Sequence, residues 1–237
     1  MSTIADHLHQ VDATIAAAAQ AAGRARDSVQ LLAVSKTFGA DAVLEAMQAG
    51  QRAFGENYLQ EALDKMQAVA RAAPGMPVEW HFIGPIQSNK TRPIASHFAW
   101  VHTVDRLKVA QRLSEQRPAG MEPLNICLQV NISGEETKSG ELEAGLPELA
   151  RQVAALPNLR LRGLMAIPEP ESDPVKQRAP FARMRELADS LREQGIALDT
   201  LSMGMSADMA AAVAEGATIV RVGSAIFGAR NYNKVKV

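Results

Sequence analysis

Eight short apolar runs with strand character alternate along this chain with segments of helical periodicity. The runs are 31–36, 52–56, 79–84, 100–104, 125–131, 159–167, 200–204 and 218–227. Strands that alternate with helices form parallel βα units, and eight units in a chain of 237 residues favour a closed (β/α)8 barrel over an open sheet. No G-x-G-x-x-G motif follows the first run, so a dinucleotide-binding sheet loses its main support. We therefore predict a single barrel domain over residues 1–237.

Helical patterns lie between most of these runs, at 40–49, 58–71, 106–116, 142–156, 175–194 and 207–214. The connection around 88–97 is shorter, and its pattern is less regular. One further helix is predicted before the first run, because Ile4, Leu8, Val11 and Ile15 recur at the spacing of an apolar helix face. Gly23 is suited to end that helix. The expected fold is thus a barrel with an extra N-terminal helix.

The composition excludes several classes of function. The chain has 25 basic and 26 acidic residues, so it lacks the basic excess that non-specific nucleic-acid binding needs. Cys127 is the only cysteine, which excludes an intramolecular disulfide and a cysteine-based zinc site. The five histidines are scattered, and we expect no metal site. No apolar stretch is long enough to span a membrane, and we expect a soluble, cytoplasmic protein.

The first run ends in a lysine, Lys36, where Thr37 begins to break the strand pattern. A lysine in that place is either a solvated strand terminus or a buried amine. A buried amine has a lowered pKa and can attack carbonyl groups. Active sites of (β/α)8 barrels form at the carboxyl ends of the strands, which is where Lys36 is expected.

Small and polar residues follow the seventh and eighth runs, where phosphate often binds in such barrels. Ser206, Gly223 and Ser224 could form a phosphate cup, because small residues let backbone N–H groups approach an anion. Ser206 could equally cap the helix predicted at 207–214. Arg221 lies within an apolar strand pattern and requires a partner, either a carboxylate such as Glu56 or a ligand.

His81 lies between two aromatic residues in the third run, and its sequence context leaves two interpretations open. It is either a core histidine with satisfied hydrogen bonds or a residue of the site. The segment 84–91 has some likeness to a P-loop, but it lacks the glycine before Lys90, and we reject that interpretation.

A lysine on strand one, combined with a phosphate cup after strands seven and eight, resembles the layout of barrels that bind pyridoxal 5′-phosphate (PLP). The chain resembles the YggS/PROSC family, the pyridoxal phosphate homeostasis proteins. The matching stretches run through nearly the whole chain in order: 33–37, 54–58, 80–90, 130–132, 138–140, 162–168, 201–206 and 220–228.

The resemblance implies a fold like the barrel domain of alanine racemase, and it assigns a role to eight residues. Lys36 would form the aldimine with the cofactor aldehyde, and Arg221 would face the pyridine nitrogen. The residues expected to hold the phosphate are Ser206, Gly223 and Ser224, and those expected to line the pocket are Asn57, His81 and Met165. No residue is assigned a catalytic role.

The resemblance further implies a cofactor-binding protein that buffers or delivers PLP without substantial turnover. We expect a monomer that makes transient contacts with PLP-dependent apo-enzymes. Phe38 stands where many bacterial members carry a second lysine, so transfer through that lysine is in doubt, although Lys138, Lys234 and Lys236 remain. A PLP-dependent amino acid racemase is the alternative, and a Schiff-base aldolase without cofactor is a third reading.

Overall fold

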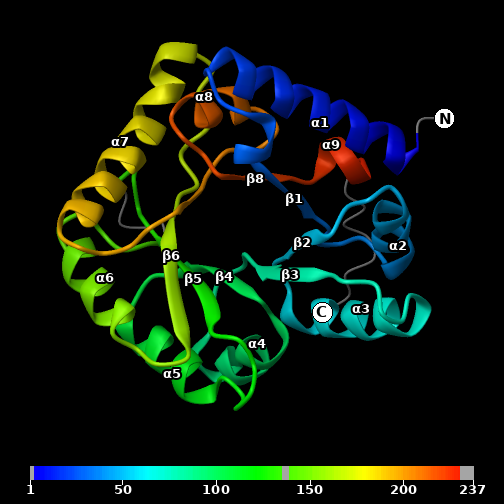
Figure 1. Ribbon diagram of the computed structural model, residues 1–237, viewed down its shortest axis with the longest axis horizontal. Coiled ribbons are helices and arrows are strands. Elements are labelled where there is room, and N and C mark those ends of the chain that lie inside the picture. The colour runs from blue at the N-terminus through cyan, green and yellow to red at the C-terminus, as the bar shows by residue number, and fades with distance from the viewer. Residues whose placement is uncertain (1–2, 135–138, 230–237) are drawn as a thin grey trace.

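The computed structural model describes residues 3–134 and 139–229, and its centre is a closed barrel of eight parallel strands (Figure 1). The strands pair in chain order, and β8 closes the barrel on β1. They are β1 (Gln30–Val34), β2 (Ala53–Glu56), β3 (Glu79–Phe82), β4 (Trp100–Val104), β5 (Leu124–Gln129), β6 (Leu159–Met165), β7 (Thr200–Ser202) and β8 (Ile219–Val222). The predicted barrel architecture is therefore confirmed.

Helices surround the strands in Figure 1 and cover the outer face of the barrel. They are α1 (Ile4–Ala21), α2 (Ala40–Gln48), α3 (Leu59–Ala72), α4 (Thr91–His97), α5 (Leu107–Gln116), α6 (Leu146–Ala154), α7 (Pro174–Glu193), α8 (Met209–Ala214) and α9 (Ser224–Phe227). Two 3₁₀ turns, η1 (Arg26–Ser28) and η2 (Ser88–Lys90), precede β1 and α4. The short third connection therefore contains a helix of two turns.

The N-terminal helix α1 is present as predicted, and it begins with a capping box. The Thr3 hydroxyl accepts a hydrogen bond from the Asp6 N–H at 3.1 Å, and the Thr3 N–H donates to the Asp6 carboxylate at 2.9 Å. Figure 1 shows α1 alongside α8, α9 and α2, and contacts join it to all three. Because α9 has only four residues, α1 supplies the helical cover that the barrel needs beside β8.

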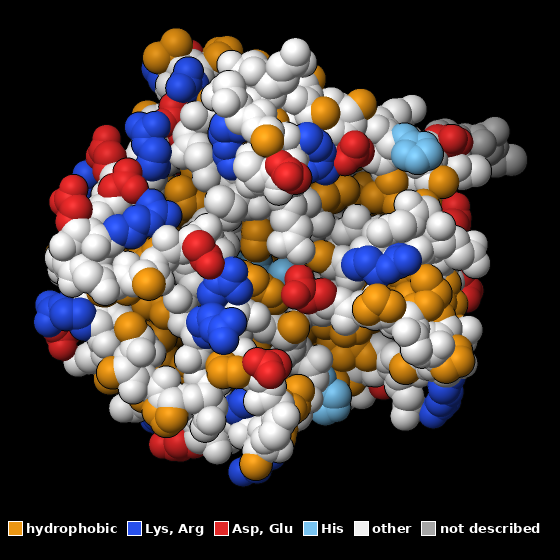
Figure 2. All heavy atoms as spheres, viewed as in Figure 1, with side chains coloured by type: hydrophobic (Ala, Val, Ile, Leu, Met, Phe, Trp, Pro, Cys, Tyr) orange, Lys and Arg blue, Asp and Glu red, His pale blue; other side chains and the backbone are white. Residues whose placement is uncertain are grey.

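The apolar core has two layers because successive strand residues point to opposite faces of the sheet. The larger layer lies between strands and helices. The smaller one lies within the barrel and consists of Leu32, Ala53, Trp100, Cys127, Met165 and Ile219. Polar side chains share that interior, so the barrel is filled on its axis by both kinds of residue. Figure 2 shows basic and acidic side chains interspersed over one face of the molecule, in keeping with the near-zero net charge.

Five predicted strands extend two residues beyond the observed β1, β3, β5, β6 and β7, and three other elements differ in the segments that follow strands or end them. Strand β8 stops at Val222, and the apolar residues up to Phe227 form α9 instead, because only Ile226 of that turn is buried. Helix α8 begins at Met209 rather than at 207, and helix α6 begins at Leu146 rather than at 142. Asp208, and not Ser206, occupies the N-cap position of α8, so the capping interpretation of Ser206 was wrong.

Candidate cofactor site

A pocket of about 270 Å³ opens at the carboxyl ends of the strands. Its volume is near the small end of the range for ligand pockets, roughly 300–1,000 Å³. Seven of the eight residues expected at the site line it: Lys36, Asn57, Met165, Ser206, Arg221, Gly223 and Ser224. Val34, Ile83, Ile167, Met205 and Ala207 complete the lining. Side chains from β1, β2, β6, β7 and β8, which are far apart in sequence, thus meet in one cavity.

Lys36 lies in a tight turn that follows β1. The Phe38 N–H closes this turn on the Ser35 carbonyl at 3.1 Å, and Lys36 itself is half-buried. The next residue, Thr37, has φ of 70°, a left-handed conformation that is unfavourable for a β-branched side chain. Its N–H donates to Glu61 at 2.7 Å, which helps to hold the strained backbone in place. The turn therefore fixes where the Lys36 side chain leaves the barrel.

A buried ion pair between α3 and the end of β2 contacts this turn at Ser35. The Lys65 ammonium, on α3, lies 2.7 Å from Glu56 Oε1 and donates to the Ser35 carbonyl at 2.8 Å. The Ser35 hydroxyl donates to the same Glu56 oxygen at 2.6 Å. Both charged side chains are almost fully buried, so they join the ends of β1 and β2 in a water-excluded contact. Burial raises the pKa of Glu56, and the nearby Lys65 opposes that shift.

Asn57 follows Glu56 and is held close to the end of β3. A Cβ atom on Gly84 would lie 2.1 Å from the Asn57 carbonyl oxygen, so only glycine allows this approach. The Asn57 side-chain Oδ1 is buried without a hydrogen-bond partner among the described residues. An unsatisfied buried amide oxygen in a pocket wall is suited to a ligand or a water.

Arg221 enters the pocket from the barrel interior, and it is only 5% exposed. Its Nη1 donates to the Ser202 carbonyl at 2.6 Å and to the Ser202 hydroxyl at 2.8 Å, and its Nη2 donates to the Ala166 carbonyl at 2.9 Å. Burial lowers the pKa of Arg221 to about 10, so the guanidinium stays charged at neutral pH. Glu56 is paired with Lys65, so of the two interpretations of Arg221 the structural ion pair with Glu56 was wrong.

The loops after β7 and β8 bring small polar residues to the pocket. Gly204 has φ of 95°, and a Cβ atom there would lie 2.6 Å from the Ala212 methyl, so this bend requires glycine. The bend returns the chain across the pocket at Met205 and Ser206. The hydroxyls of Ser206 and Ser224 have no hydrogen-bond partner within residues 3–134 and 139–229, and both residues are exposed. They are available to an anion.

His81 is the one expected site residue that does not line the pocket. It lies inside the barrel, where Nδ1 is 2.9 Å from His102 Nε2 and Nε2 is 2.9 Å from Glu79 Oε1. Its ring stacks on Trp100 with centroids 5.4 Å apart. Two residues along the same strand face, Ile83 reaches the pocket instead. The core interpretation of His81 therefore describes its position.

Phe38, at the position where the family resemblance led us to look for a second lysine, packs against Phe227 with ring centroids 5.2 Å apart. This contact joins the turn after β1 to α9, which carries Ser224. The remaining candidate lysines Lys138, Lys234 and Lys236 lie outside the described residues. Within those residues, no group of three or more His, Cys, Asp or Glu side chains is placed to hold a metal ion. No helix of the described chain is long and apolar enough to cross a membrane.

Comparison with known proteins agrees with this geometry. Residues 7–231 match the family described as alanine racemase, N-terminal domain. The chain is 64% identical to the pyridoxal phosphate homeostasis protein of Pseudomonas aeruginosa, over 98% of each chain. The chain belongs to the pyridoxal phosphate homeostasis protein family. The member of this family from Escherichia coli K12 is 54% identical over 99% of this chain and 100% of its own.

Solved structures place this family member among related barrels. PipY of Synechococcus elongatus, with PLP bound, is 38% identical and has a TM-score of 0.82, covering 95% of this chain and 100% of its own. Alanine racemase from Corynebacterium glutamicum has a TM-score of 0.66 at 16% identity, covering 97% of this chain and 63% of its own. At that identity the likeness shows the fold alone. The expected likeness to the barrel domain of alanine racemase is confirmed.

Proposed function

We propose that the protein binds PLP in this pocket and serves its homeostasis by storing the cofactor or by delivering it to PLP-dependent enzymes. The observation that carries the proposal is the convergence of Lys36 and Arg221 in one cavity with the serines of two neighbouring loops. The names of its relatives and the PLP-bound PipY structure support it.

The residues present fit this cofactor. Lys36 supplies a half-buried primary amine at the pocket wall. Ser206 and Ser224 supply hydroxyls with no partner in the described chain, and Gly223 lines the same pocket. Arg221 has five N–H groups, of which three donate to Ser202 and Ala166. The other two remain as donors for a ring nitrogen.

When bound, PLP supplies an aldehyde that reacts with amines and a ring that withdraws electrons. Lys36 would hold the aldehyde end covalently, while Ser206, Gly223 and Ser224 would hold the phosphate and Asn57 and Met165 would contact the ring. Arg221 keeps its own proton at neutral pH because its pKa is about 10. It would therefore donate a hydrogen bond to the ring nitrogen without protonating it.

We infer that the protein has no substantial catalytic turnover. An unprotonated ring nitrogen accepts electrons weakly, which disfavours the carbanion that racemases and transaminases require. Racemisation also requires a base on each face of the substrate. Tyr58, the tyrosine within the described residues, is 48% exposed and does not line the pocket. Among the described residues of the pocket, no contact favours the racemase alternative.

Spectroscopic titration with PLP tests the binding proposal. The unmodified protein should develop a visible absorption band that borohydride reduction fixes on the peptide carrying Lys36. Lys36→Ala should lose this band, whereas Lys176→Ala, which alters an exposed lysine of α7, should keep it. Reduction of a full band onto another lysine in Lys36→Ala would contradict the assignment.

The phosphate assignment is tested by comparing PLP with pyridoxal, which lacks the phosphate. Ser224→Asp places a like charge beside the phosphate, so it should weaken PLP binding by about tenfold or more and pyridoxal binding far less. Ser190→Asp, on the exposed side of α7, adds the same charge away from the pocket and serves as the control. Equal weakening of both ligands by Ser224→Asp would remove the phosphate role.

Incubation of the PLP-loaded protein with single L-amino acids in deuterated water tests turnover. Mass spectrometry and chiral chromatography should detect no α-deuteration or D-isomer at ordinary enzyme rates, on the order of 1 s⁻¹ or faster. Rapid formation of the D-isomer would favour the racemase alternative.

The proposal also includes a single-domain monomer that acts in the cytoplasm through transient contacts with apo-enzymes. Light scattering and mixing with such apo-enzymes test the monomer and the contacts.

A further inference from the structure

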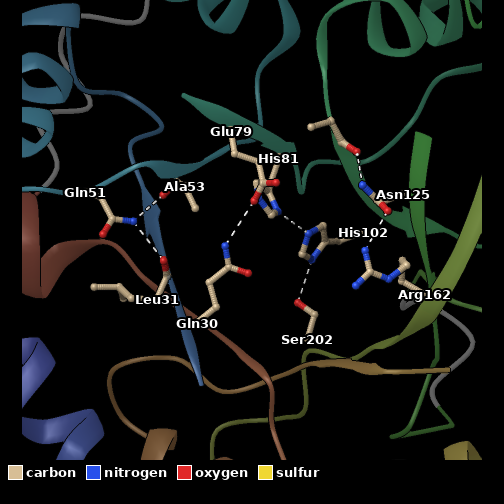
Figure 3. Close-up of polar contacts among 11 residues, drawn as sticks. Gln30, Leu31, Gln51, Ala53, Glu79, His81, His102, Asn125, Arg162 and Ser202 are labelled. Carbon is tan, nitrogen blue, oxygen red and sulfur yellow. Dashed lines mark hydrogen bonds and ion pairs between the residues drawn. The ribbon is translucent and has the colours of Figure 1, made fainter. Parts of the chain in front are cut away.

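A line of polar side chains crosses the barrel interior and ends at Arg221. Figure 3 shows its first part, in which Glu79, His81, His102 and Ser202 point to one another in turn. The contacts are 2.9 Å from Glu79 Oε1 to His81 Nε2, 2.9 Å from His81 Nδ1 to His102 Nε2, and 2.8 Å from His102 Nδ1 to Ser202 Oγ. Arg221 Nη1 then lies 2.8 Å from Ser202 Oγ.

The chemistry of the Glu79 end fixes the direction of these hydrogen bonds. The hydrogen bond with His81 lowers the pKa of Glu79 to about 2, so its carboxylate accepts only. His81 Nε2 must therefore carry a proton. Burial lowers the pKa values of His81 and His102, so both rings are neutral and each has one acceptor nitrogen. It follows that His102 Nε2 donates to His81 Nδ1, and His102 Nδ1 accepts.

The Arg221 end leads to the same direction independently. A guanidinium donates and never accepts, so the Ser202 oxygen accepts from Arg221 Nη1. The Ser202 hydroxyl proton then points to His102 Nδ1, which is the acceptor that the other end requires. Every donor has one acceptor, and every bond points from the pocket toward the start of β3. Residues from four strands agree on one direction.

We propose that Ser202, His102 and His81 are positioning residues that hold the Arg221 guanidinium in the pocket through a one-directional hydrogen-bond chain ending on Glu79. Both N–H groups of Arg221 Nη1 are engaged by Ser202, which orients the rest of the fork. Asp208 acts on the Arg221 charge only through space, and no carboxylate of the described chain is hydrogen-bonded to Arg221. The polarised chain is therefore its hydrogen-bonded route to a carboxylate. The affinity arm of the test below rests on the proposed function.

Histidine nitrogen NMR of the unmodified, cofactor-free protein tests the direction without any substitution. His81 and His102 should both show the neutral form with the proton on Nε2 near neutral pH. A proton on Nδ1 of His102, or a doubly protonated His81, would reverse the chain and overturn the proposal. This arm does not depend on PLP binding.

A matched pair of substitutions at His102 tests the link to Arg221. An asparagine amide overlies the Nδ1 side of a histidine ring, so His102→Asn keeps an acceptor for the Ser202 hydroxyl but loses the donor to His81. A glutamine amide overlies Nε2, so His102→Gln does the reverse. Both variants should lose stability, because each leaves one buried group unsatisfied. The PLP dissociation constant should rise about tenfold in His102→Gln and less than about threefold in His102→Asn.

Glu79→Leu tests the far end, where the Glu79 side chain is 42% exposed, and the variant should therefore still fold. It should abolish the single Nε2–H pattern of both histidines and weaken PLP binding by about threefold. Gln51→Leu is the control and should change neither, because the Gln51 side chain lies at the same barrel end and, among the described residues, donates to the Leu31 and Ala53 carbonyls rather than to the chain. Unchanged histidine spectra in Glu79→Leu, or equal affinities in the two His102 variants, would overturn the proposal. Failure of the unmodified protein to bind PLP would instead overturn the proposed function.

Discussion

Two buried cations flank the candidate site, and they are neutralised in different ways. Lys65 contacts Glu56 directly at 2.7 Å and lies behind the turn that carries Lys36. Arg221 donates to carbonyl groups and one hydroxyl, and within the described chain its hydrogen bonds lead to a carboxylate through three neutral side chains. A direct ion pair is closed to ligands, whereas a guanidinium held by neutral acceptors keeps donors for one. The first arrangement suits a structural brace, and the second suits a ligand contact.

The largest effect is expected from breaking the direct pair. Lys65→Met leaves the Glu56 carboxylate buried without its cation, and removal of one partner of such a pair costs about 3–5 kcal/mol. Chemical denaturation should show a loss of that size near pH 8. Burial already raises the pKa of Glu56, and the loss of Lys65 raises it further. The folded variant then binds a proton more readily than the unfolded chain, so the loss should shrink as pH falls.

Lys176→Met, on the exposed side of α7, provides the control and should change stability by less than about 0.5 kcal/mol. A loss in Lys65→Met no larger than in this control would mean that Glu56 and Lys65 do not brace the turn.

The pair was missed in the sequence, although a signal for it exists. Lys65 shares a helix stripe with the buried Ala62 and Val69, at spacings of three and four residues, so its burial followed from the same periodicity that predicted the helix. A buried lysine requires a carboxylate, and Glu56 at the end of β2 was available. The sequence offered Glu56 only as one possible partner of Arg221, whereas the cation that it pairs with is Lys65.

The parts of the site that follow from strand order were predictable. Parallel strands bring their carboxyl ends to one rim, so Lys36 and the loops after β7 and β8 had to meet there. Contacts across the barrel axis were not predictable in the same way. His102 and Ser202 are 100 residues apart, and their contact depends on which strands face each other inside a closed barrel. His81 was assigned to the pocket, but the residue that lines it is Ile83, two positions further along on the same face.

The second prediction concerns the relayed cation. Arg221→Lys keeps the charge but cannot reach two carbonyl groups and a hydroxyl with a planar fork. It should weaken PLP binding by about tenfold or more and lower the free energy of unfolding by about 1–3 kcal/mol, less than Lys65→Met. Paired denaturation and absorbance titrations measure both effects. If Arg221→Lys costs more stability than Lys65→Met and leaves PLP binding intact, the two cations have exchanged roles.

The third prediction is a pH dependence that belongs to the relayed chain. His81 faces Glu79, His102 and Trp100, and His102 faces His81, Ser202 and the Arg221 charge. Burial lowers both histidine pKa values below 6.5, so the unfolded chain binds more protons between the folded pKa and 6.5. The contribution of the two histidines to stability is therefore fully present above about pH 6.5. Below that pH, the free energy of unfolding falls by up to about 1.4 kcal/mol per histidine and pH unit.

Denaturation at about pH 7.5 and 5.5 measures this slope. His102→Asn removes one of the two titrating histidines, so the dependence of stability on pH should become about half as steep. An unchanged slope in that variant would assign the acid sensitivity to other residues.

The smallest effect is expected at the strained turn beside Lys36. Thr37 has φ of 70° and a buried hydroxyl with no hydrogen-bond partner in the described chain, so its side chain makes the turn less stable than it could be. Thr37→Gly removes both costs but adds backbone freedom to the unfolded chain, and the net change should be a stabilisation of less than about 1 kcal/mol. The N–H that donates to Glu61 is retained, so the position of Lys36 and the PLP affinity should stay within about threefold. A large fall in affinity with unchanged stability would show that the Thr37 hydroxyl contacts the ligand, and the Lys36 side would then hold an open polar contact like that of Arg221.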